Sequence, residues 1–343
     1  MNILVTGAAG FIGSNLIRWL IANTDHTLIC IESFKPGMKS NPQRLQQALA
    51  GAPKTRYFVY EWDLTHTFSL PFIYQLKQHD IDVILNVASD SHVTRSITNP
   101  AACWFNNTAL IYNMLDLAIA LRSKLKAFIQ VSTDEVYGDA GWDGPAHAEW
   151  DPIVPSNPYS ASKAAQEALA ISYFRTYGIP VIITNTMNVI GLWQDPEKFV
   201  PKAIKRILNE EQVEFHADIT TDGYRIASRV WLDVENMACA MSFIIENLNK
   251  IVFDFRGKPP RFHLVGDTEL SVLAISERLA TLLGKTLKSK IVQGDNVRPG
   301  YDRRYALSDN NLKALGYTHP ISLDDSLAQI INWVRQNPNW VYE

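Results

Sequence analysis

The stretch MNILVTGAAGFIGSNLIRWLIAN, residues 1–23, decides the fold of this chain. Its apolar start, NILV, predicts a short buried strand, and FIGSNLIRWLIAN has the apolar spacing of an amphipathic helix. Gly7, Gly10 and Gly13 stand between the two. Glycines at a strand-to-helix turn permit a tight turn and let the backbone approach a pyrophosphate at the helix N-terminus. A glycine trio alone is weak, but in this context it predicts a dinucleotide site.

The strand and helix pattern repeats along the first half of the chain. Further apolar runs at residues 26–33, 55–63, 81–89, 126–133 and 179–186 predict strands. They are too continuous to be half solvated, which is typical of a parallel sheet covered on both faces. Helical stretches at 100–123 and 158–178 lie between some of them. This alternation predicts an α/β protein with a Rossmann-like doubly wound parallel sheet.

After residue 187 strands become sparse, and residues 198–211, 270–284 and 323–337 read as packing helices. We therefore expect an NAD-binding domain over 1–187, to which the strand and helix of 229–250 return. Residues 188–228 and 251–343 are expected to form a smaller mixed α/β lobe. This lobe should cover the carboxyl ends of the strands, where doubly wound folds bind ligands.

Composition excludes several classes of protein. The formal charge is only −3, with acids and bases interspersed, so we expect no nucleic acid partner. No apolar run has the length of a membrane span, and the first residues form a strand instead of a signal peptide. The cysteines Cys30, Cys103 and Cys239 are scattered and form no CxxC pair. We expect a cytoplasmic protein with reduced thiols, no membrane contact and no metal site.

Two acids follow predicted strands at the cofactor end. Glu32 ends the second strand, where an acid can accept hydrogen bonds from the adenosine ribose and repels a 2′-phosphate. The predicted cofactor is therefore NAD and not NADP. Asp63 follows the third strand and is placed to meet the adenine. It also suits the N-cap of the following turn, and the two roles are compatible.

The segment VSTDEVYGD, residues 131–139, ends the fifth strand in two adjacent carboxylates, Asp134 and Glu135. Carboxylates are costly to bury. A pair at a strand end suits an elimination, which needs one acid and one base at neighbouring carbons. The alternative is that the pair only caps a turn.

Downstream, NPYSASKAAQE places Tyr159 and Lys163 four residues apart, on one face of a helix. A lysine cation near a phenol favours the phenolate, so we expect a lowered pKa for Tyr159 and a role as a base. A single YxxxK pattern is common by chance. It gains weight from the glycine turn and from the hydroxyls of Ser132 and Thr133 at the end of the fifth strand.

TGAAGFIG, STDEVYG and PYSASKA resemble the extended short-chain dehydrogenase/reductase superfamily. VASDSHVTRSI, NTMNVIGLWQDPEKFVP and RPGYDRRYALS narrow the resemblance to the nucleotide-sugar 4,6-dehydratases, and above all to the dTDP-glucose 4,6-dehydratases. It extends over essentially the whole chain. The resemblance implies an NAD-dependent hydro-lyase of deoxysugar biosynthesis that acts on a nucleotide-diphosphate hexose.

The resemblance also implies roles for individual residues. Thr133, Tyr159 and Lys163 would serve the oxidation of the sugar at C4, with hydride passing to NAD. Glu135 would remove the C5 hydrogen and Asp134 would protonate the departing C6 hydroxyl, after which hydride returns to C6. The expected cofactor contacts are Gly7, Gly10, Phe11, Ile12, Gly13, Glu32, Asp63, Leu64, Ala88, Tyr159 and Lys163. The expected substrate contacts are Ser91, His92, Arg95, Asn188, Glu197, Lys198, Arg229, Arg298 and Tyr301.

The sequence departs from the usual family pattern at several places. The family usually has aspartate where this chain has Glu32, and its Asn-Tyr-Gly reads NVIG here. HADITTDGYRIAS replaces a glycine-rich stretch before Arg229. These departures leave the sugar and the base open, so a 4,6-dehydratase acting on another nucleotide sugar such as UDP-GlcNAc is an alternative. A UDP-sugar 4-epimerase or decarboxylase, which usually lacks the Asp-Glu pair, and a non-catalytic NAD-binding scaffold are further alternatives.

The helices predicted around residues 108–121 and 160–177 carry apolar residues around more than one stripe. A single sheet cannot bury all of them. We therefore expect a homodimer in which these two helices of each subunit form a four-helix interface, as the resemblance also implies.

Overall fold

The computed structural model of the chain describes residues 1–35, 41–293, 300 and 302–342. Its largest element is a seven-stranded sheet in the order β11-β6-β5-β4-β1-β2-β3, with every neighbouring pair parallel. The strands are β1 (Asn2–Thr6), β2 (Thr27–Glu32), β3 (Tyr57–Glu61), β4 (Val83–Asn86), β5 (Ala127–Thr133), β6 (Val181–Thr186) and β11 (Arg261–Leu264). The predicted doubly wound parallel sheet is confirmed.

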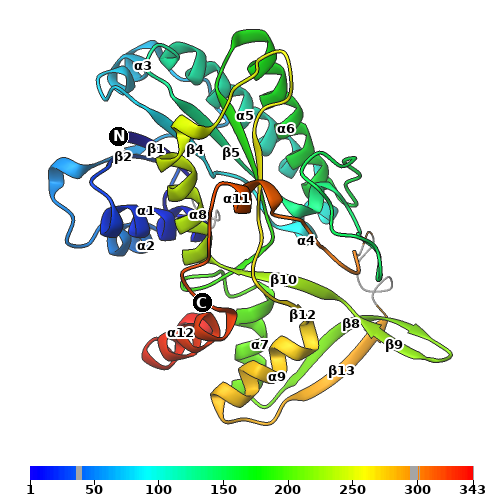
Figure 1. The fold of residues 1–343 in the computed structure, drawn as a ribbon. Helices are drawn as coiled ribbons and strands as arrows, with labels where there is room; N and C mark the ends of the chain where they lie inside the picture. The colour runs from blue at the N-terminus through cyan, green and yellow to red at the C-terminus, as the bar shows by residue number, and fades with distance from the viewer. Residues whose placement is uncertain (36–40, 294–299, 301, 343) are drawn as a thin grey trace.

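Helices cover both faces of this sheet (Figure 1). α1 (Phe11–Asn23), α2 (Pro42–Ala48) and α8 (Val234–Glu246) contribute to the core on one face. α3 (Leu70–Lys77), α5 (Pro100–Leu121) and α6 (Pro158–Tyr177) contribute to the core on the other. In β1, Ile3 and Val5 belong to the first core and Leu4 to the second. Because side chains alternate across a strand, a sheet buried on both faces requires continuous apolar strands.

The edge strand β3 differs from this expectation. Phe58 and Val59 are 38% and 42% exposed, although their apolar run predicts burial. β3 is the last strand of the sheet order, so it has a sheet neighbour on one side only, β2. The exposure of Phe58 and Val59 follows from the position of β3 at the edge of the sheet. Sequence periodicity does not predict that position.

The C-terminal part of the chain forms two small sheets below the large one (Figure 1). One contains β7 (Asn188–Ile190), β10 (Ser228–Asp233) and β12 (Glu269–Ser271). The other contains β8 (Gln212–Thr220), β9 (Gly223–Ile226) and β13 (Lys288–Gln293). α7 (Phe199–Leu208), α9 (Val272–Leu283) and α12 (Leu323–Gln336) share a third core with them. The shorter elements are α4 (Val93–Thr98), α11 (Asn310–Ala314), η1 (Lys54–Arg56), η2 (Asp134–Val136), η3 (Leu248–Lys250) and η4 (Trp340–Tyr342).

The segment 229–250 is shared between the two parts of the molecule. Its strand, β10, pairs with β7 and β12 and does not join the large sheet. Its helix, α8, contributes to the core of the large sheet. The Asp233 carboxylate accepts a hydrogen bond of 2.6 Å from the Glu235 N–H, so the chain turns from the small sheet straight into this helix. β11, which was expected in the C-terminal lobe, instead pairs with β6 in the large sheet. The division into two domains stays a prediction.

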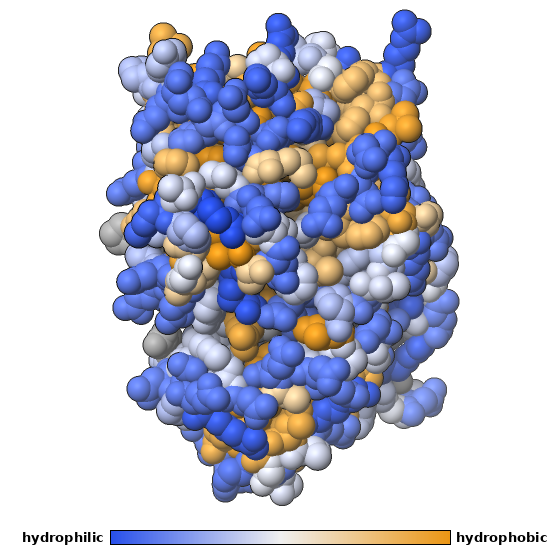
Figure 2. All heavy atoms as spheres, turned by 60° about the vertical axis from the view of Figure 1, so that its left-hand side comes forward, coloured by the Kyte–Doolittle hydropathy of each residue, from blue (hydrophilic) through white to orange (hydrophobic). Residues whose placement is uncertain are grey.

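The face of the molecule in Figure 2 is largely hydrophilic, with hydrophobic side chains gathered in separate patches. Among the described residues, no helix combines the length and the apolar character that crossing a bilayer requires.

Candidate active site

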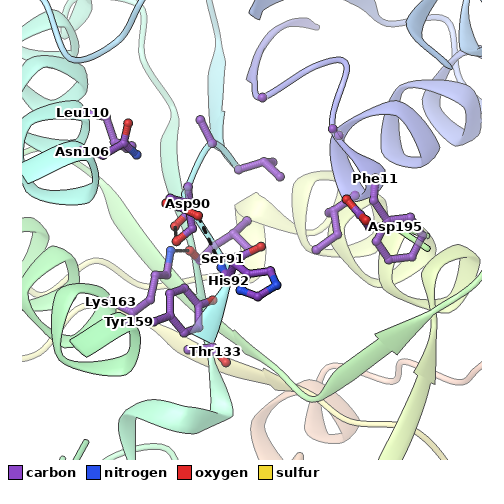
Figure 3. A pocket seen from close by; sticks show the side chains of 18 of the residues that line it. Phe11, Asp90, Ser91, His92, Asn106, Leu110, Thr133, Tyr159, Lys163 and Asp195 are labelled. Carbon is purple, nitrogen blue, oxygen red and sulfur yellow. Dashed lines mark hydrogen bonds between the residues drawn. The ribbon is translucent and has the colours of Figure 1, made fainter. Parts of the chain in front are cut away.

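A cavity of about 410 Å³ lies at the carboxyl ends of β1, β2, β4, β5 and β6 (Figure 3). Its walls come from the glycine turn after β1, from the ends of these strands, from α6 and from the segment 186–198 that leads to the C-terminal part. Ligands of doubly wound folds bind at this edge of the sheet. The cavity is therefore the candidate active site.

The glycine turn is shaped as a cradle. Gly7 has φ +65°, and the N–H of Gly10 donates to the Gly7 carbonyl oxygen at 3.0 Å. A Cβ on Gly13 would lie 2.1 Å from that same oxygen, so a side chain there is excluded. α1 begins at Phe11, and its N-cap, Gly10, brings no capping side chain to the first N–H groups. Such an N-terminus suits a pyrophosphate, so the turn fits a dinucleotide.

The acids expected at the adenosine end both line the cavity. Glu32 accepts hydrogen bonds from the N–H of Ala9 at 3.0 Å and of Ser33 at 2.8 Å. Asp63 accepts from the N–H and the hydroxyl of Thr65 at 3.0 and 2.8 Å, as its turn-capping role requires, and pairs with Lys35. Partial burial opposes ionisation, but the hydrogen bonds from Lys35 and Thr65 lower the pKa of Asp63.

The two carboxylates after β5 lie in different surroundings. Asp134 is 4% exposed and accepts a hydrogen bond of 2.9 Å from the Thr133 hydroxyl through Oδ1. Its Oδ2 is buried with no hydrogen-bond partner among the described residues. Burial, and then the charge of Glu135, raise the pKa of Asp134 to about 7. Glu135 is half-buried and accepts a hydrogen bond of 3.2 Å from the Asn157 side chain.

Tyr159 and Lys163 enter the cavity from the first two turns of α6 (Figure 3). A capping box between Asn157 and Ser160 fixes the start of this helix. The Lys163 ammonium donates to the Val131 carbonyl oxygen at 2.7 Å and to the Gln166 side chain at 2.6 Å. Burial lowers its pKa to about 8.

The pKa of Tyr159 differs from the sequence expectation. Burial, followed by the charges of Glu135 and Asp134, raises this pKa well above its ordinary value. The expected lowering by Lys163 does not occur here, because the ammonium hydrogen bonds go to Val131 and Gln166. Spacing along a helix predicted the shared face but not the direction of these hydrogen bonds.

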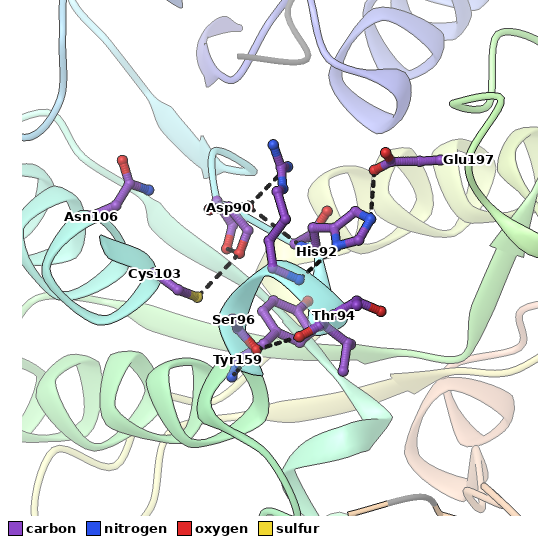
Figure 4. Close-up of polar contacts among 12 residues, drawn as sticks. Asp90, His92, Thr94, Ser96, Cys103, Asn106, Tyr159 and Glu197 are labelled. Carbon is purple, nitrogen blue, oxygen red and sulfur yellow. Dashed lines mark hydrogen bonds and ion pairs between the residues drawn. The ribbon is translucent and has the colours of Figure 1, made fainter. Parts of the chain in front are cut away.

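The rim of the cavity joins the segment 90–95 to the segment 195–198 (Figure 4). His92 Nε2 lies 2.8 Å from a Glu197 carboxylate oxygen, and Lys198 donates to the Ser91 carbonyl oxygen at 3.1 Å. Arg95 pairs with Asp90 at 3.3 Å. The structure brings to this one cavity the predicted residues Gly7, Gly10, Phe11, Ile12, Gly13, Glu32, Asp63, Leu64, Ala88, Ser91, His92, Arg95, Thr133, Asp134, Glu135, Tyr159, Lys163, Asn188, Glu197 and Lys198.

Residues 3–253 match the model of the NAD dependent epimerase/dehydratase family. The chain belongs to this family. It is 33% identical to the low-salt glycan biosynthesis protein Agl12 of Haloferax volcanii, over 97% of this chain and 98% of that one. It is 32% identical to the dTDP-glucose 4,6-dehydratase of Haemophilus influenzae, over 97% of each chain.

Solved structures agree with this membership. The crystal structure of dTDP-glucose 4,6-dehydratase from Streptomyces venezuelae with NAD bound has a TM-score of 0.83 at 28% identity, over 99% of this chain and 98% of that one. UDP-glucuronic acid 4-epimerase from Bacillus cereus has a TM-score of 0.82 at 24% identity, over 98% of this chain and 100% of that one, which is a likeness of fold alone. The predicted resemblance is confirmed, and NAD is the cofactor of this epimerase/dehydratase family.

Among the described residues, one predicted substrate contact, Arg229, is not in the cavity wall. Arg229 is buried and donates to the carbonyl oxygens of Ser228, Asp302 and Arg303 at 2.6, 2.8 and 2.9 Å. Its guanidinium carbon lies 4.4 Å from the ring centre of Tyr305. Its donors therefore face the backbone, and its contact with substrate stays a prediction. Arg298 and Tyr301 lie outside the described residues.

Several polar residues that form hydrogen bonds around the candidate active site were not predicted from the sequence. The Ser96 hydroxyl accepts a hydrogen bond of 3.1 Å from the Tyr159 N–H (Figure 4). Asn107 donates to the Asp90 carbonyl oxygen at 3.0 Å and to the Ser162 hydroxyl at 2.9 Å. Only Asn157 carried a sequence signal, as a cap residue before a proline. The others act across distant segments, which periodicity does not reveal.

Proposed function

We propose that the chain is a nucleotide-sugar 4,6-dehydratase that converts dTDP-glucose to dTDP-4-keto-6-deoxyglucose and water. The observation that carries this proposal is the contrast between Asp134, buried with a pKa of about 7, and the half-buried Glu135 beside it. Both line the same cavity as Tyr159 and Lys163. Two carboxylates in different surroundings provide an acid and a base at one sugar.

The oxidation half of the reaction belongs to Thr133, Tyr159 and Lys163. When bound, NAD supplies the hydride acceptor for C4 and the hydride donor for C6. Deprotonated Tyr159 takes the proton of the sugar 4-hydroxyl through its phenolate oxygen. Because burial, and then the charges of Glu135 and Asp134, raise the pKa of Tyr159, formation of the phenolate requires a cation nearby, and Lys163 stands one helical turn away on α6.

The elimination half belongs to the carboxylate pair. A ketone at C4 acidifies the C5 hydrogen, which the Glu135 carboxylate removes. Asp134, protonated through a substantial part of the neutral range, gives its proton to the departing C6 oxygen. The C5–H and C6–O bonds break, and water leaves. General acid and base groups each contribute about a hundred- to ten-thousandfold in rate.

A UDP-sugar 4-epimerase is the second candidate. Tyr159, Lys163 and the NAD cradle would serve it equally, and the fold of UDP-glucuronic acid 4-epimerase is similar. A 4-epimerisation expels no group from C6, so the reaction needs no buried acid near that carbon. Asp134 therefore favours the dehydratase. The relatives named as dTDP-glucose 4,6-dehydratases support that nucleotide sugar, and a relative named for UDP-glucose 4,6-dehydration, 32% identical to this chain, makes UDP-glucose the second substrate to test.

We further propose that the enzyme is a cytoplasmic homodimer. α5 and α6 pack together and leave apolar side chains on their outer surface. Phe105 is 69% exposed, and Trp104, Tyr112 and Tyr177 are between 42% and 49% exposed. A second copy of the same two helices would bury these side chains in a four-helix interface.

The direct experiment incubates the enzyme, saturated with NAD, separately with dTDP-glucose, UDP-glucose and UDP-GlcNAc, and identifies the products by NMR. We expect a 4-keto-6-deoxyhexose from dTDP-glucose, with one solvent deuterium at C5 in heavy water. The matched control is Glu135→Gln, which keeps size and hydrogen bonding. A 4-epimer as the sole product, or unchanged turnover by Glu135→Gln, would overturn the proposal.

A further inference from the structure

Arg261 and Glu167 form a buried ion pair outside the cavity that Asp134 and Glu135 line. Arg261, at the start of β11, donates from Nη2 to the Glu167 carboxylate on α6 at 2.7 Å. The two side chains are 1% and 0% exposed. Neither lines the cavity. The proposed reaction therefore leaves this pair without a direct role.

Glu167 is linked to the first residue of the catalytic turn, defined here as residues 133–137. Its second carboxylate oxygen accepts a hydrogen bond of 2.7 Å from the Asn185 side chain on β6. The same Asn185 nitrogen donates to the Thr133 carbonyl oxygen at 3.1 Å. Glu167 also lies one helical turn after Lys163, on the same face of α6.

Arg261 is linked to the last residue of the same turn. Its Nη1 donates to the Tyr137 hydroxyl oxygen at 2.7 Å. The Tyr137 hydroxyl also lies 2.9 Å from His263 Nε2 and 2.9 Å from the Glu149 carbonyl oxygen. His263 Nδ1 is 2.7 Å from the Ser308 carbonyl oxygen and so carries the proton. The two residues of one ion pair thus hold both ends of the catalytic turn.

Folding stability is a poor explanation for this arrangement. Arg261 Nε and Asn185 Oδ1 are buried without a hydrogen-bond partner among the described residues. Incomplete buried networks are costly, and apolar side chains of similar volume often replace a buried ion pair without loss of stability. What apolar side chains cannot replace is the direct hydrogen bond from Arg261 to Tyr137 and the link from Glu167 through Asn185 to Thr133.

We propose that Arg261 and Glu167 are positioning residues that hold the turn carrying Asp134 and Glu135 at a fixed distance from Tyr159 and Lys163 on α6. The inference rests on the proposed function for the roles of the two carboxylates. The link itself, from α6 through the ion pair to both ends of the turn, stands on the hydrogen bonds above. A misplacement of about 1 Å at reacting groups can cost about a hundredfold in rate.

The test distinguishes the stability cost of an unpaired buried charge from an effect on the position of the catalytic turn. Glu167→Gln and Arg261→Met each leave one buried charge unpaired and should lower the thermal midpoint of the NAD-saturated enzyme. The double variant Arg261→Met/Glu167→Leu removes both charges and should recover that midpoint. Arg261→Lys keeps the charge but has one nitrogen in place of the fork. The exposed pair Arg278–Asp324, changed to Met and Asn, is the matched control.

Hydrogen exchange of the turn reports the position without requiring turnover. The Tyr137 and Gly138 N–H groups bond to the carbonyl oxygens of Asp134 and Glu135 at 3.1 and 3.3 Å. We expect these amides to exchange at least about tenfold faster in the double variant, despite its recovered midpoint, and also in Arg261→Lys. Wild-type exchange in both variants would overturn the inference, whatever reaction the enzyme catalyses.

Kinetics add a second readout for the dehydratase. The double variant should lose about a hundredfold in kcat with KM within about twofold, because the turn touches the transition state more than the bound nucleotide. Arg261→Lys should be intermediate and the control variant unchanged. A double variant with both wild-type midpoint and wild-type kcat would contradict a positioning role for the pair. Absence of dehydration by the wild type would contradict the proposed function instead.

Discussion

Glu32 and Ala9 are joined by a hydrogen bond of 3.0 Å from the Ala9 N–H to a carboxylate oxygen of Glu32. The acid that ends β2 is therefore bound to the glycine turn that follows β1. Its other oxygen accepts the Ser33 N–H at 2.8 Å, so the carboxylate is held in place before the cofactor arrives. Glu32 lines the cavity, where the resemblance leads us to expect the adenosine of the cofactor.

This relationship predicts the choice of cofactor. Glu32→Gln keeps the length of the side chain and an oxygen for Ala9 but removes the charge that repels a 2′-phosphate. We expect the preference for NAD over NADP to narrow by at least about tenfold, which corresponds to about 1.4 kcal/mol. Calorimetric titration with each cofactor measures it. Equal affinity of the wild type for the two cofactors would contradict the role of Glu32.

Two glycines of the cradle should respond differently to alanine. Gly13→Ala would push a methyl group to 2.1 Å from the Gly7 backbone, so we expect a loss of about 1–3 kcal/mol in unfolding free energy. Among the described residues, a Cβ on Gly10 meets the Gly7 oxygen alone, at 3.2 Å, and Gly10 lines the cavity. Gly10→Ala should therefore fold nearly normally but weaken NAD binding at least about tenfold, because the backbone approaches the pyrophosphate there. Urea unfolding and NAD titration distinguish the two, and the reverse pattern would contradict this account.

Asp134→Asn should stabilise the fold at neutral pH. The folded carboxyl has a pKa of about 7 against an ordinary value of 3.8, so its ionisation lowers stability as the pH rises between these values. Asparagine removes this cost. We expect a gain of on the order of 2–4 kcal/mol above about pH 7, which vanishes below about pH 4.

Chemical unfolding across this pH range measures the gain. Asp80→Asn, which removes a carboxylate at an exposed site, is the control for the loss of a charge alone. A constant difference between Asp134→Asn and the wild type at every pH would mean that burial does not disfavour the Asp134 charge.

The carboxylates and the oxidation machinery should fail at different steps. Glu135→Gln should oxidise C4 and accumulate bound NADH but exchange no C5 hydrogen with deuterated solvent. Tyr159→Phe should leave the cofactor oxidised, and Asp134→Asn should exchange C5 hydrogen while losing water slowly. Single-turnover absorbance and NMR follow these steps, with losses of about a hundred- to ten-thousandfold expected. Normal C5 exchange by Glu135→Gln would show that the carboxylate pair is structural.

The proposed homodimer can be tested at the exposed aromatic side chains of α5. Phe105→Glu places a charge on the most exposed aromatic side chain of that surface, where burial against a second copy becomes costly. We expect the wild type to sediment as a dimer at micromolar concentration and the variant as a monomer. Leu70→Glu on α3, where the leucine is 81% exposed, should leave the dimer intact. A monomeric wild type would rule out the four-helix interface.

Several features of the protein follow from local sequence alone. The alternation of apolar runs and amphipathic helices determined the parallel sheet, because strands buried on both faces must be apolar throughout. The bounds of α1, Phe11–Asn23, match the predicted segment FIGSNLIRWLIAN. The glycine turn, Asp134 with Glu135, and Tyr159 with Lys163 were also evident, since each motif lies within a few residues of one chain segment.

Other features were decided only when distant segments met. The exposure of β3 depends on its place at the edge of the sheet. β10 lies in a small sheet instead of the large one, and β11 joins the large sheet instead of the C-terminal part. The pKa of Tyr159 depends first on its burial and then on two carboxylates from another element, and Lys163 donates a hydrogen bond to Val131. Arg261 and Glu167 are 94 positions apart in the chain and carried no local signal. A hydrogen bond or a charge acts through space, so its partner is known only after the chain has folded.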